Sequence, residues 1–301
     1  MRRVIRRVMR NTSLTVTAIV LLASQALAAD LNRPAYVYKA PPPQPLPVYS
    51  WTGFYVGGDV GAKWLRDKWT ATSLFDNGGP APGLGFPALP IDASSPRTYD
   101  LTGFRAGGYV GYNWQFSPTW VGGIEGDAAW ANESQTRAGL PGCSTPAGCV
   151  AGVATPPGPT FGGDTTSVKM LWDASARARL GYLVTPDLLL YATGGAAFQR
   201  IEVFGQCGPY FISAHCLSNT VNFLAPGITQ STTLVGWTVG VGLEHHLWGN
   251  WLLRAEYRYA DFGTWNTSFP FFAGPLVNNN TYRFSNAVNT NIFKAGLAYK
   301  F

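Results

Sequence analysis

The feature that most constrains this chain is a two-residue alternation of apolar and polar side chains. In residues 51–64, WTGFYVGGDVGAKW, most side chains at even-numbered positions, such as Phe54 and Trp64, are apolar. Most of those at odd-numbered positions, such as Asp59 and Lys63, are small or charged. Successive side chains of an extended strand point to opposite faces, so the pattern predicts a strand with one apolar face. The glycines of this stretch lack the spacing of a phosphate-binding loop, and no helical periodicity follows them.

The same alternation returns seven more times, which predicts eight strands in all. In each segment one parity is apolar and aromatic, and the other holds most of the polar and charged residues. The further segments are residues 101–116, 120–130, 168–184, 188–200, 235–246, 251–259 and 293–301.

Short and long connections alternate between the predicted strands, and this alternation decides the topology. The short connections are residues 117–119, 185–187 and 248–250, which consist mainly of turn-forming residues. The long connections, rich in Gly, Pro, Asn, Ser and Thr, are residues 66–100, 131–164, 203–231 and 261–286. We therefore predict an all-β fold: an eight-stranded antiparallel transmembrane β-barrel with short periplasmic turns and long extracellular loops.

The strand length agrees with a membrane span. Residues 120–130 begin with Trp120 and end with Trp130. A strand of about ten residues extends about 33 Å, and a tilt near ~40° reduces this to about 25 Å, the height of the lipid-facing band between two aromatic girdles. A soluble secreted β-protein is the alternative, but it would hide its apolar faces between two sheets without requiring aromatic residues at both strand ends.

The N-terminal segment predicts export. Residues 1–28 contain five arginines, a short apolar run and the sequence Ala-Leu-Ala, the features of a secretory signal peptide cut after Ala28. The run is shorter than the ~20 residues of a bilayer-spanning helix, which weighs against a membrane anchor. We interpret residues 29–50 as a Pro-rich periplasmic linker, with docking onto an aromatic groove as the alternative. Residues 51–301 then form the outer-membrane barrel.

Loss of the signal peptide changes the charge balance. The chain has 22 Lys and Arg against 16 Asp and Glu, and five of the arginines lie in the signal peptide, so 17 basic residues remain against 16 acidic ones. The mature chain is nearly neutral, and we expect no nucleic-acid partner.

The polar face of the predicted strands carries charged residues, and we place these in the barrel interior. Because buried charges must pair, we expect a salt-bridge network that fills the core, with a narrow ion-conducting path as the alternative. A wide diffusion pore would need about sixteen strands. The predicted interior residues are Asp59, Lys63, Arg105, Glu125, Asp127, Lys169, Asp173, Arg177, Arg179, Glu244, Arg254, Glu256, Arg258, Lys294 and Lys300.

Four cysteines lie in two of the long connections. Cys143 and Cys149 share one, and Cys207 and Cys216 share another, so each loop can close on itself with a disulfide in an oxidising compartment. Four cysteines allow three pairings, and the sequence does not decide among them. A metal site is the alternative, but these spacings are poor for zinc and only His215 lies nearby.

No constellation of catalytic residues is apparent. His245 and His246 have opposite parity beside a predicted periplasmic turn, and His215 has no carboxylate partner nearby in sequence. Solvated or hydrogen-bonded histidines explain these positions better than a catalytic triad does. We therefore predict no enzyme and no cofactor.

Several motifs resemble the small outer-membrane proteins of alphaproteobacteria, known as porin-family or outer-membrane immunogenic proteins, within the OmpA-like barrel group. The motifs are YSWTGFYVGGDVGAKW at 49–64, GFRAGGYVGYNWQF at 103–116, GGIEGD at 122–127, RARLGY at 177–182 and FKAGLAYKF at 293–301. The likeness covers residues 30–301 and is weakest in the long connections.

The resemblance implies an eight-stranded surface barrel in the outer membrane of a Gram-negative bacterium, with roles in envelope integrity and in contact with a host or the environment. It also implies that Phe293, Tyr299 and Phe301 form the C-terminal signal read by the barrel-assembly machinery. Outer-membrane lipid and lipopolysaccharide are the other expected partners, together with a ligand at the extracellular loops. Weak porin activity is the alternative function. Unlike OmpA itself, no peptidoglycan-binding segment follows Phe301.

Overall fold

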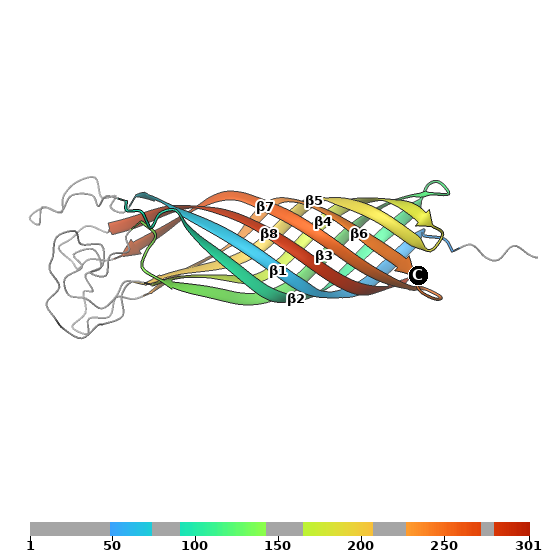
Figure 1. The fold of residues 1–301 in the computed structure, drawn as a ribbon, viewed down its shortest axis with the longest axis horizontal. Helices are drawn as coiled ribbons and strands as arrows, with labels where there is room; N and C mark the ends of the chain where they lie inside the picture. The colour runs from blue at the N-terminus through green and yellow to red at the C-terminus, as the bar shows by residue number, and fades with distance from the viewer. Residues whose placement is uncertain (1–48, 74–90, 143–164, 207–226, 272–279) are drawn as a thin grey trace, which may run out of the picture. The chain divides into compact units, whose positions relative to one another are not determined.

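The computed structural model describes residues 49–73, 91–142, 165–206, 227–271 and 280–301. Eight antiparallel strands close into one barrel in chain order, with the first strand paired to the last (Figure 1). This confirms the predicted fold. No helix within these ranges is long and apolar enough to cross a bilayer. The strands are β1 (Gly53–Ser73), β2 (Arg97–Gln115), β3 (Trp120–Ala138), β4 (Thr165–Thr185), β5 (Leu188–Gln206), β6 (Ile228–His246), β7 (Trp251–Phe271) and β8 (Asn280–Lys300).

An apolar belt surrounds the barrel between two rings of outward-facing aromatic residues. Aliphatic residues such as Val60, Ile124 and Leu297 lie exposed between the rings. The ring beside the short turns contains Phe54, Trp114, Phe116, Trp120, Tyr182, Trp251, Tyr299 and Phe301. The ring on the extracellular side contains Trp64, Phe104, Trp130, Trp172, Trp237 and Phe293. Such girdles mark the two borders of the hydrocarbon layer.

The two faces of the barrel wall exchange polarity at the extracellular border of this belt. Below the border, the outward face of β1 is apolar up to Trp64, and its inward face is polar up to Lys63. Above it, Arg66 and Lys68 face outward and are exposed, whereas Leu65 and the following inward residues include large apolar side chains. The strand therefore leaves the lipid and continues as the wall of an apolar-cored barrel in water.

The strands are 19 to 21 residues long, and they extend into segments that the sequence analysis assigned to loops. For example, β1 continues to Ser73 and β2 begins at Arg97, within the predicted loop 66–100. The reason is the exchange of polarity, because above the border an apolar residue faces inward. The loops are correspondingly shorter than predicted.

A β-bulge in β4 corrects the prediction for Lys169. The pairing of β4 with both neighbours shifts just after Met170, and an inserted residue reverses the parity of the strand beyond it. Val168 and Met170 are fully buried inside the barrel, although their parity predicted contact with lipid. Lys169 therefore has the outward parity, is only partly buried, and does not belong to the interior charges.

The backbone pairing of the wall is interrupted at two seams that begin at the border. β2 pairs with β3 only over residues 106–115, and β6 pairs with β7 only over residues 237–246. Among the described residues beyond these ranges, the extracellular part consists of two four-stranded sheets, β7-β8-β1-β2 and β3-β4-β5-β6 (Figure 1). Side chains bridge one seam, since the Gln135 amide accepts from Asp100 N at 3.0 Å and Arg97 donates to Ala138 O at 3.0 Å.

The belt predicts a depth-dependent cost for an outward charge. Replacement Val60→Arg places a cation in the lipid belt on β1, and we expect the free energy of unfolding in lipid vesicles to fall by about 2–4 kcal/mol. Thr70→Arg is the control, because Thr70 lies exposed on the same face of β1 above the border and should change the stability little. Urea titrations of the folded barrel measure both. Equal losses for the two variants would contradict the assigned border.

Candidate functional site

Six acidic and seven basic side chains fill the middle of the barrel interior. Each is at most 6% exposed, and they come from every strand except β5. They are Asp59, Lys63, Arg105, Glu125, Asp127, Asp173, Arg177, Arg179, Glu244, Arg254, Glu256, Arg258 and Lys294. The structure thus places the predicted interior charges together, apart from Lys169 and Lys300.

Asp127 on β3 is the centre of the network. Its carboxylate accepts from Arg105 at 2.6 Å and from Arg258 at 2.7 Å, and the Arg177 guanidinium lies at 3.4 Å. Lys294 Nζ lies 3.8 Å from the other oxygen. Four cations from four strands therefore surround one carboxylate, which ties β3 to β2, β4, β7 and β8.

Asp173 and Asp59 extend the network toward the extracellular side. Asp173 pairs with Lys63 at 2.7 Å and with Arg258 at 3.0 Å. Asp59 pairs with Arg105 and, at 3.1 Å, with Lys294. The side chains of β1 and β4 are linked in this way across the lumen, although the two strands are not neighbours in the wall.

Glutamates form the part of the network nearer the short turns. Glu125 accepts from Arg177 and from Arg254, each at 2.6 Å. Glu244 accepts from Arg179 at 2.7 Å and from Arg254 at 2.9 Å. Glu256 accepts from Arg177 at 2.7 Å and lies 3.5 Å from Lys294, so it joins this part to the group around Asp127.

Aromatic residues close the interior below the charges. The rings of Tyr109 and Tyr191 lie 4.2 Å from the Arg254 and Arg179 guanidinium carbons, a cation–π distance. The Tyr55 hydroxyl donates to Glu125 at 2.7 Å. These tyrosines form a buried cluster with Trp51, Val121, Leu183, Leu189, Leu252 and Ala298.

At the periplasmic end, a hydrogen bond and ring stacking hold the residues just before β1 against the short turns. Trp51 is fully buried and donates through Nε1 to Pro186 O at 3.0 Å. Tyr49 stacks on His246 with ring centroids 3.8 Å apart, and burial raises the pKa of the Tyr49 hydroxyl above its ordinary value. His246 also bonds Asp187 Oδ1 at 3.0 Å and Gly249 O at 2.9 Å, which joins two of the short turns.

A large apolar cluster that was not predicted from the sequence fills the interior above the charges. The only signal was the continued alternation beyond Trp64 with the polarity exchanged. Its members share full or nearly full burial inside the extracellular part of the barrel. They include Leu65, Trp69, Tyr99, Leu101, Leu140, Val168, Met170, Ile201, Val203, Leu234, Phe262, Phe269, Tyr282, Phe284 and Val288.

The remaining predicted residues lie elsewhere. Phe293, Tyr299 and Phe301 face outward from the last strand and its end, exposed to the lipid belt. Lys300 lies apart from the network and donates to Thr52 O at 3.1 Å near the periplasmic end. Cys143, Cys149, Cys207, Cys216 and His215 fall outside the described residues, as do the signal peptide and nearly all of the linker, so these stay predictions.

The chemistry of the interior is that of a packed and neutralised core. Moving a charge into a medium of low dielectric is very unfavourable unless partners compensate it, and here each of the six carboxylates contacts at least two cations. In the part of the chain that the structure describes, no cluster of His, Cys, Asp and Glu has the arrangement of a metal site. The network joins strands and occupies the lumen.

Comparison with known proteins agrees with this architecture. Residues 14–301 match the sequence model of the outer membrane protein beta-barrel domain. The 31 kDa outer-membrane immunogenic protein of Brucella melitensis is 29% identical over 286 residues, which cover 93% of this chain and 95% of that protein. The 25 kDa outer-membrane immunogenic protein of the same organism is 27% identical over 300 residues, which cover 98% and 100%.

Among solved structures, the chain is similar to the outer membrane protein OprG from Pseudomonas aeruginosa, at 14% identity and a TM-score of 0.43. The match covers 83% of this chain and 96% of that chain. The family match, in contrast, spans nearly the whole sequence. The relatives named above are outer-membrane proteins of Gram-negative bacteria. The chain therefore belongs to the outer membrane protein β-barrel domain family and resides in the outer membrane of a Gram-negative cell.

Proposed function

We propose that side chains block the lumen of this outer-membrane barrel. We propose further that the protein has a structural role in the cell envelope and carries an extracellular interaction surface. The observation that carries the proposal is the filling of the lumen by three successive layers. These are the aromatic cluster around Trp51, the ionic network around Asp127, and the apolar cluster around Trp69. Eight strands leave a lumen that side chains alone can fill.

A narrow channel is the second candidate, and the upper layer weighs against it. An ion path needs a continuous polar or water-filled lining. The ionic layer supplies such groups, but its charges already bind one another at 2.6–3.1 Å in most pairs. Above it, the interior is lined mainly by apolar side chains such as Leu65, Phe269 and Phe284, which exclude water, with Asp67 and Asn286 buried among them.

We further propose that the protein is not an enzyme. The relatives named above are outer-membrane immunogenic proteins, names without a catalytic activity. Within the described residues, the carboxylates and guanidinium groups of the ionic network bond one another rather than being presented to a substrate. The absence of a cofactor remains a prediction from the sequence.

The outer surface supports the proposed partners. Above the belt, Arg66 and Lys68 face outward at the level of the lipid headgroups, which favours contact with lipopolysaccharide. The outward Phe293, Tyr299 and Phe301 suit recognition by the barrel-assembly machinery. A host or environmental ligand would bind the extracellular loops, because loops vary most and carry recognition.

Because side chains fill the lumen, we predict that the protein does not conduct ions across a bilayer. Purified protein inserted into a planar bilayer should give no stable unit currents, because the ionic and apolar layers block the lumen. A variant with Glu125→Ser and Arg254→Ser removes two large partners from the ionic layer and serves as a comparison, and it too should stay closed, since the apolar layer is intact. Steady unit currents from the unmodified protein would overturn the closed-barrel proposal in favour of the channel.

The ionic layer predicts a large stability loss when its centre is neutralised. Asp127→Asn keeps the shape of the side chain but removes one of the two carboxylates that Arg105 and Arg258 share, the other being that of Asp173. The interior then holds an additional uncompensated positive charge, so we expect the free energy of unfolding to fall by about 3–5 kcal/mol. Asp100→Asn is the control, because Asp100 is 57% exposed in its pair with Arg66 and such surface pairs contribute at most about 1 kcal/mol. Denaturant titration in lipid vesicles compares the two, and equal losses would show that the buried network is not a stabilising element.

A further inference from the structure

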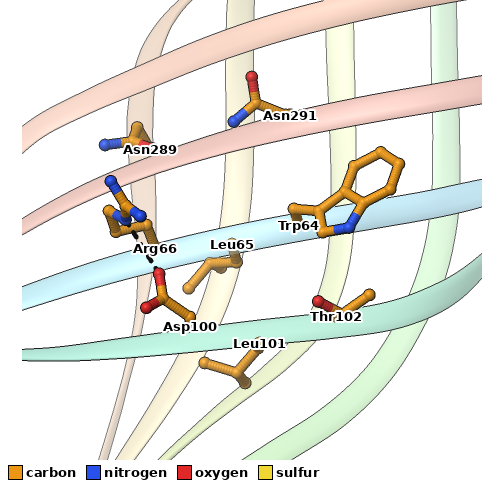
Figure 2. A pocket seen from close by; sticks show the side chains of 8 residues that line it. All are labelled: Trp64, Leu65, Arg66, Asp100, Leu101, Thr102, Asn289 and Asn291. Carbon is orange, nitrogen blue, oxygen red and sulfur yellow. Dashed lines mark hydrogen bonds and ion pairs between the residues drawn. The ribbon is translucent and has the colours of Figure 1, made fainter.

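A cavity lined by both polar and apolar groups lies on the outer wall of the barrel, where three strands emerge from the apolar belt. Its volume is about 360 Å³, at the lower end of the ~300–1,000 Å³ range of small-molecule sites. Figure 2 shows Trp64 at one end of the cavity and the Arg66–Asp100 ion pair at the other. Residues of β1, β2 and β8 line it: Trp64, Leu65, Arg66, Asp100, Leu101, Thr102, Asn289 and Asn291.

The lining groups have the chemistry that binds a sugar. Trp64 is 42% exposed and offers an aromatic face, against which the C–H face of a sugar ring can pack. The side chains of Thr102 and Asn289 offer neutral donors and acceptors for hydroxyl groups. The Tyr257 hydroxyl donates to Asn291 Oδ1 at 2.7 Å, and Figure 2 shows the Asn291 amide nitrogen on the cavity side.

The Arg66–Asp100 pair adds a site for an anionic substituent. The two side chains are 64% and 57% exposed and their bonded atoms are 2.9 Å apart. Exposed pairs contribute little to stability, so the Arg66 guanidinium can turn to a ligand at small cost. A guanidinium binds phosphate or carboxylate through two parallel hydrogen bonds. The cavity therefore suits a sugar that carries a phosphate or carboxylate.

The height of the cavity identifies where such a sugar comes from. Phe104 on β2 and Phe293 on β8 are the last outward apolar residues below it, and with Trp64 they mark the border of the hydrocarbon. Aromatic side chains at such a border lie at the headgroup level. In the outer leaflet of a Gram-negative outer membrane, the headgroup at this level is the phosphorylated sugar of lipopolysaccharide.

We propose that this cavity binds one sugar of the lipopolysaccharide headgroup, with Trp64 packed on the ring, the two asparagines and Thr102 bonded to its hydroxyl or amide groups, and Arg66 paired with its phosphate. The acyl chains of the same molecule lie along the belt below. This inference deepens the proposed surface role and rests on it only in requiring that the barrel face the outer leaflet. A free oligosaccharide has the same recognition chemistry, and the experiment separates the two sources.

The test compares two sides of the barrel at one height. The site variant combines Arg66→Gln with Asn289→Ala. The matched control combines Arg200→Gln with Thr233→Ala, because Arg200 and Thr233 face outward just above the belt on β5 and β6, with Arg200 Nη1 3.4 Å from Thr233 Oγ1. Each full-length barrel is folded into phospholipid nanodiscs, lipopolysaccharide is titrated in, and native mass spectrometry counts the molecules bound per barrel.

We expect the site variant to bind lipopolysaccharide about tenfold more weakly than the unmodified protein, and the control variant to bind like the unmodified protein. An equal fall in both variants would show unspecific headgroup adsorption and overturn the site, as would no fall in the site variant. Binding of the delipidated oligosaccharide as tightly as the intact glycolipid would overturn the lipid source.

The binding experiment and the planar-bilayer experiment test the cavity assignment and the blocked lumen separately. Unit currents from the unmodified protein would overturn the closed barrel without changing the binding difference between the two variants. Equal binding by the two variants would overturn the cavity assignment while the barrel stays silent in a planar bilayer. Unchanged resistance of both variants to unfolding in mild detergent is the control for folding.

Discussion

The structure depends on one constraint: a backbone N–H or C=O group that lies in hydrocarbon must find its partner within the protein. A sheet meets this constraint only when its first and last strands pair, as β1 and β8 do from Tyr55 onward. Closure with eight strands fixes a small lumen, and the lipid makes the outer face apolar. The polar residues of the strands can then lie only inside, where they must neutralise one another.

The ionic network makes that neutralisation a set of links between distant parts of the chain. Lys294 bonds Asp59, 235 residues away in sequence, and Arg258 bonds Asp127 across 131 residues. Each such pair is satisfied only when the strands have their native register, because a slip by one residue turns the side chain into lipid. The charges therefore select one arrangement of the barrel among the many that the apolar belt alone would allow.

Sequence reasoning predicts the part of the fold that lies in lipid, because there the outward parity is apolar from end to end. It places the strand order, the short turns and nearly all of the interior charges. It fails above Trp64, where water replaces lipid and the same parity becomes polar, so that strand residues look like loops. It also fails at Lys169, because the residues at the bulge beside Met170 carry no mark that distinguishes them from regular strand residues.

The exchange of polarity and the two seams occur near the same height. Together they separate a membrane part of the barrel, with one continuous wall, from an extracellular part made of two sheets. On the membrane side of the seams, all eight strands form one continuous ladder. Beyond residue 106 on β2 and residue 237 on β6, that ladder ends, and the two sheets share an apolar core and a few side-chain bridges. A substitution or insertion in the outer sheets can thus alter their spacing without shifting the register inside the bilayer. The exposed region can therefore change in sequence while the membrane ring keeps its strand register.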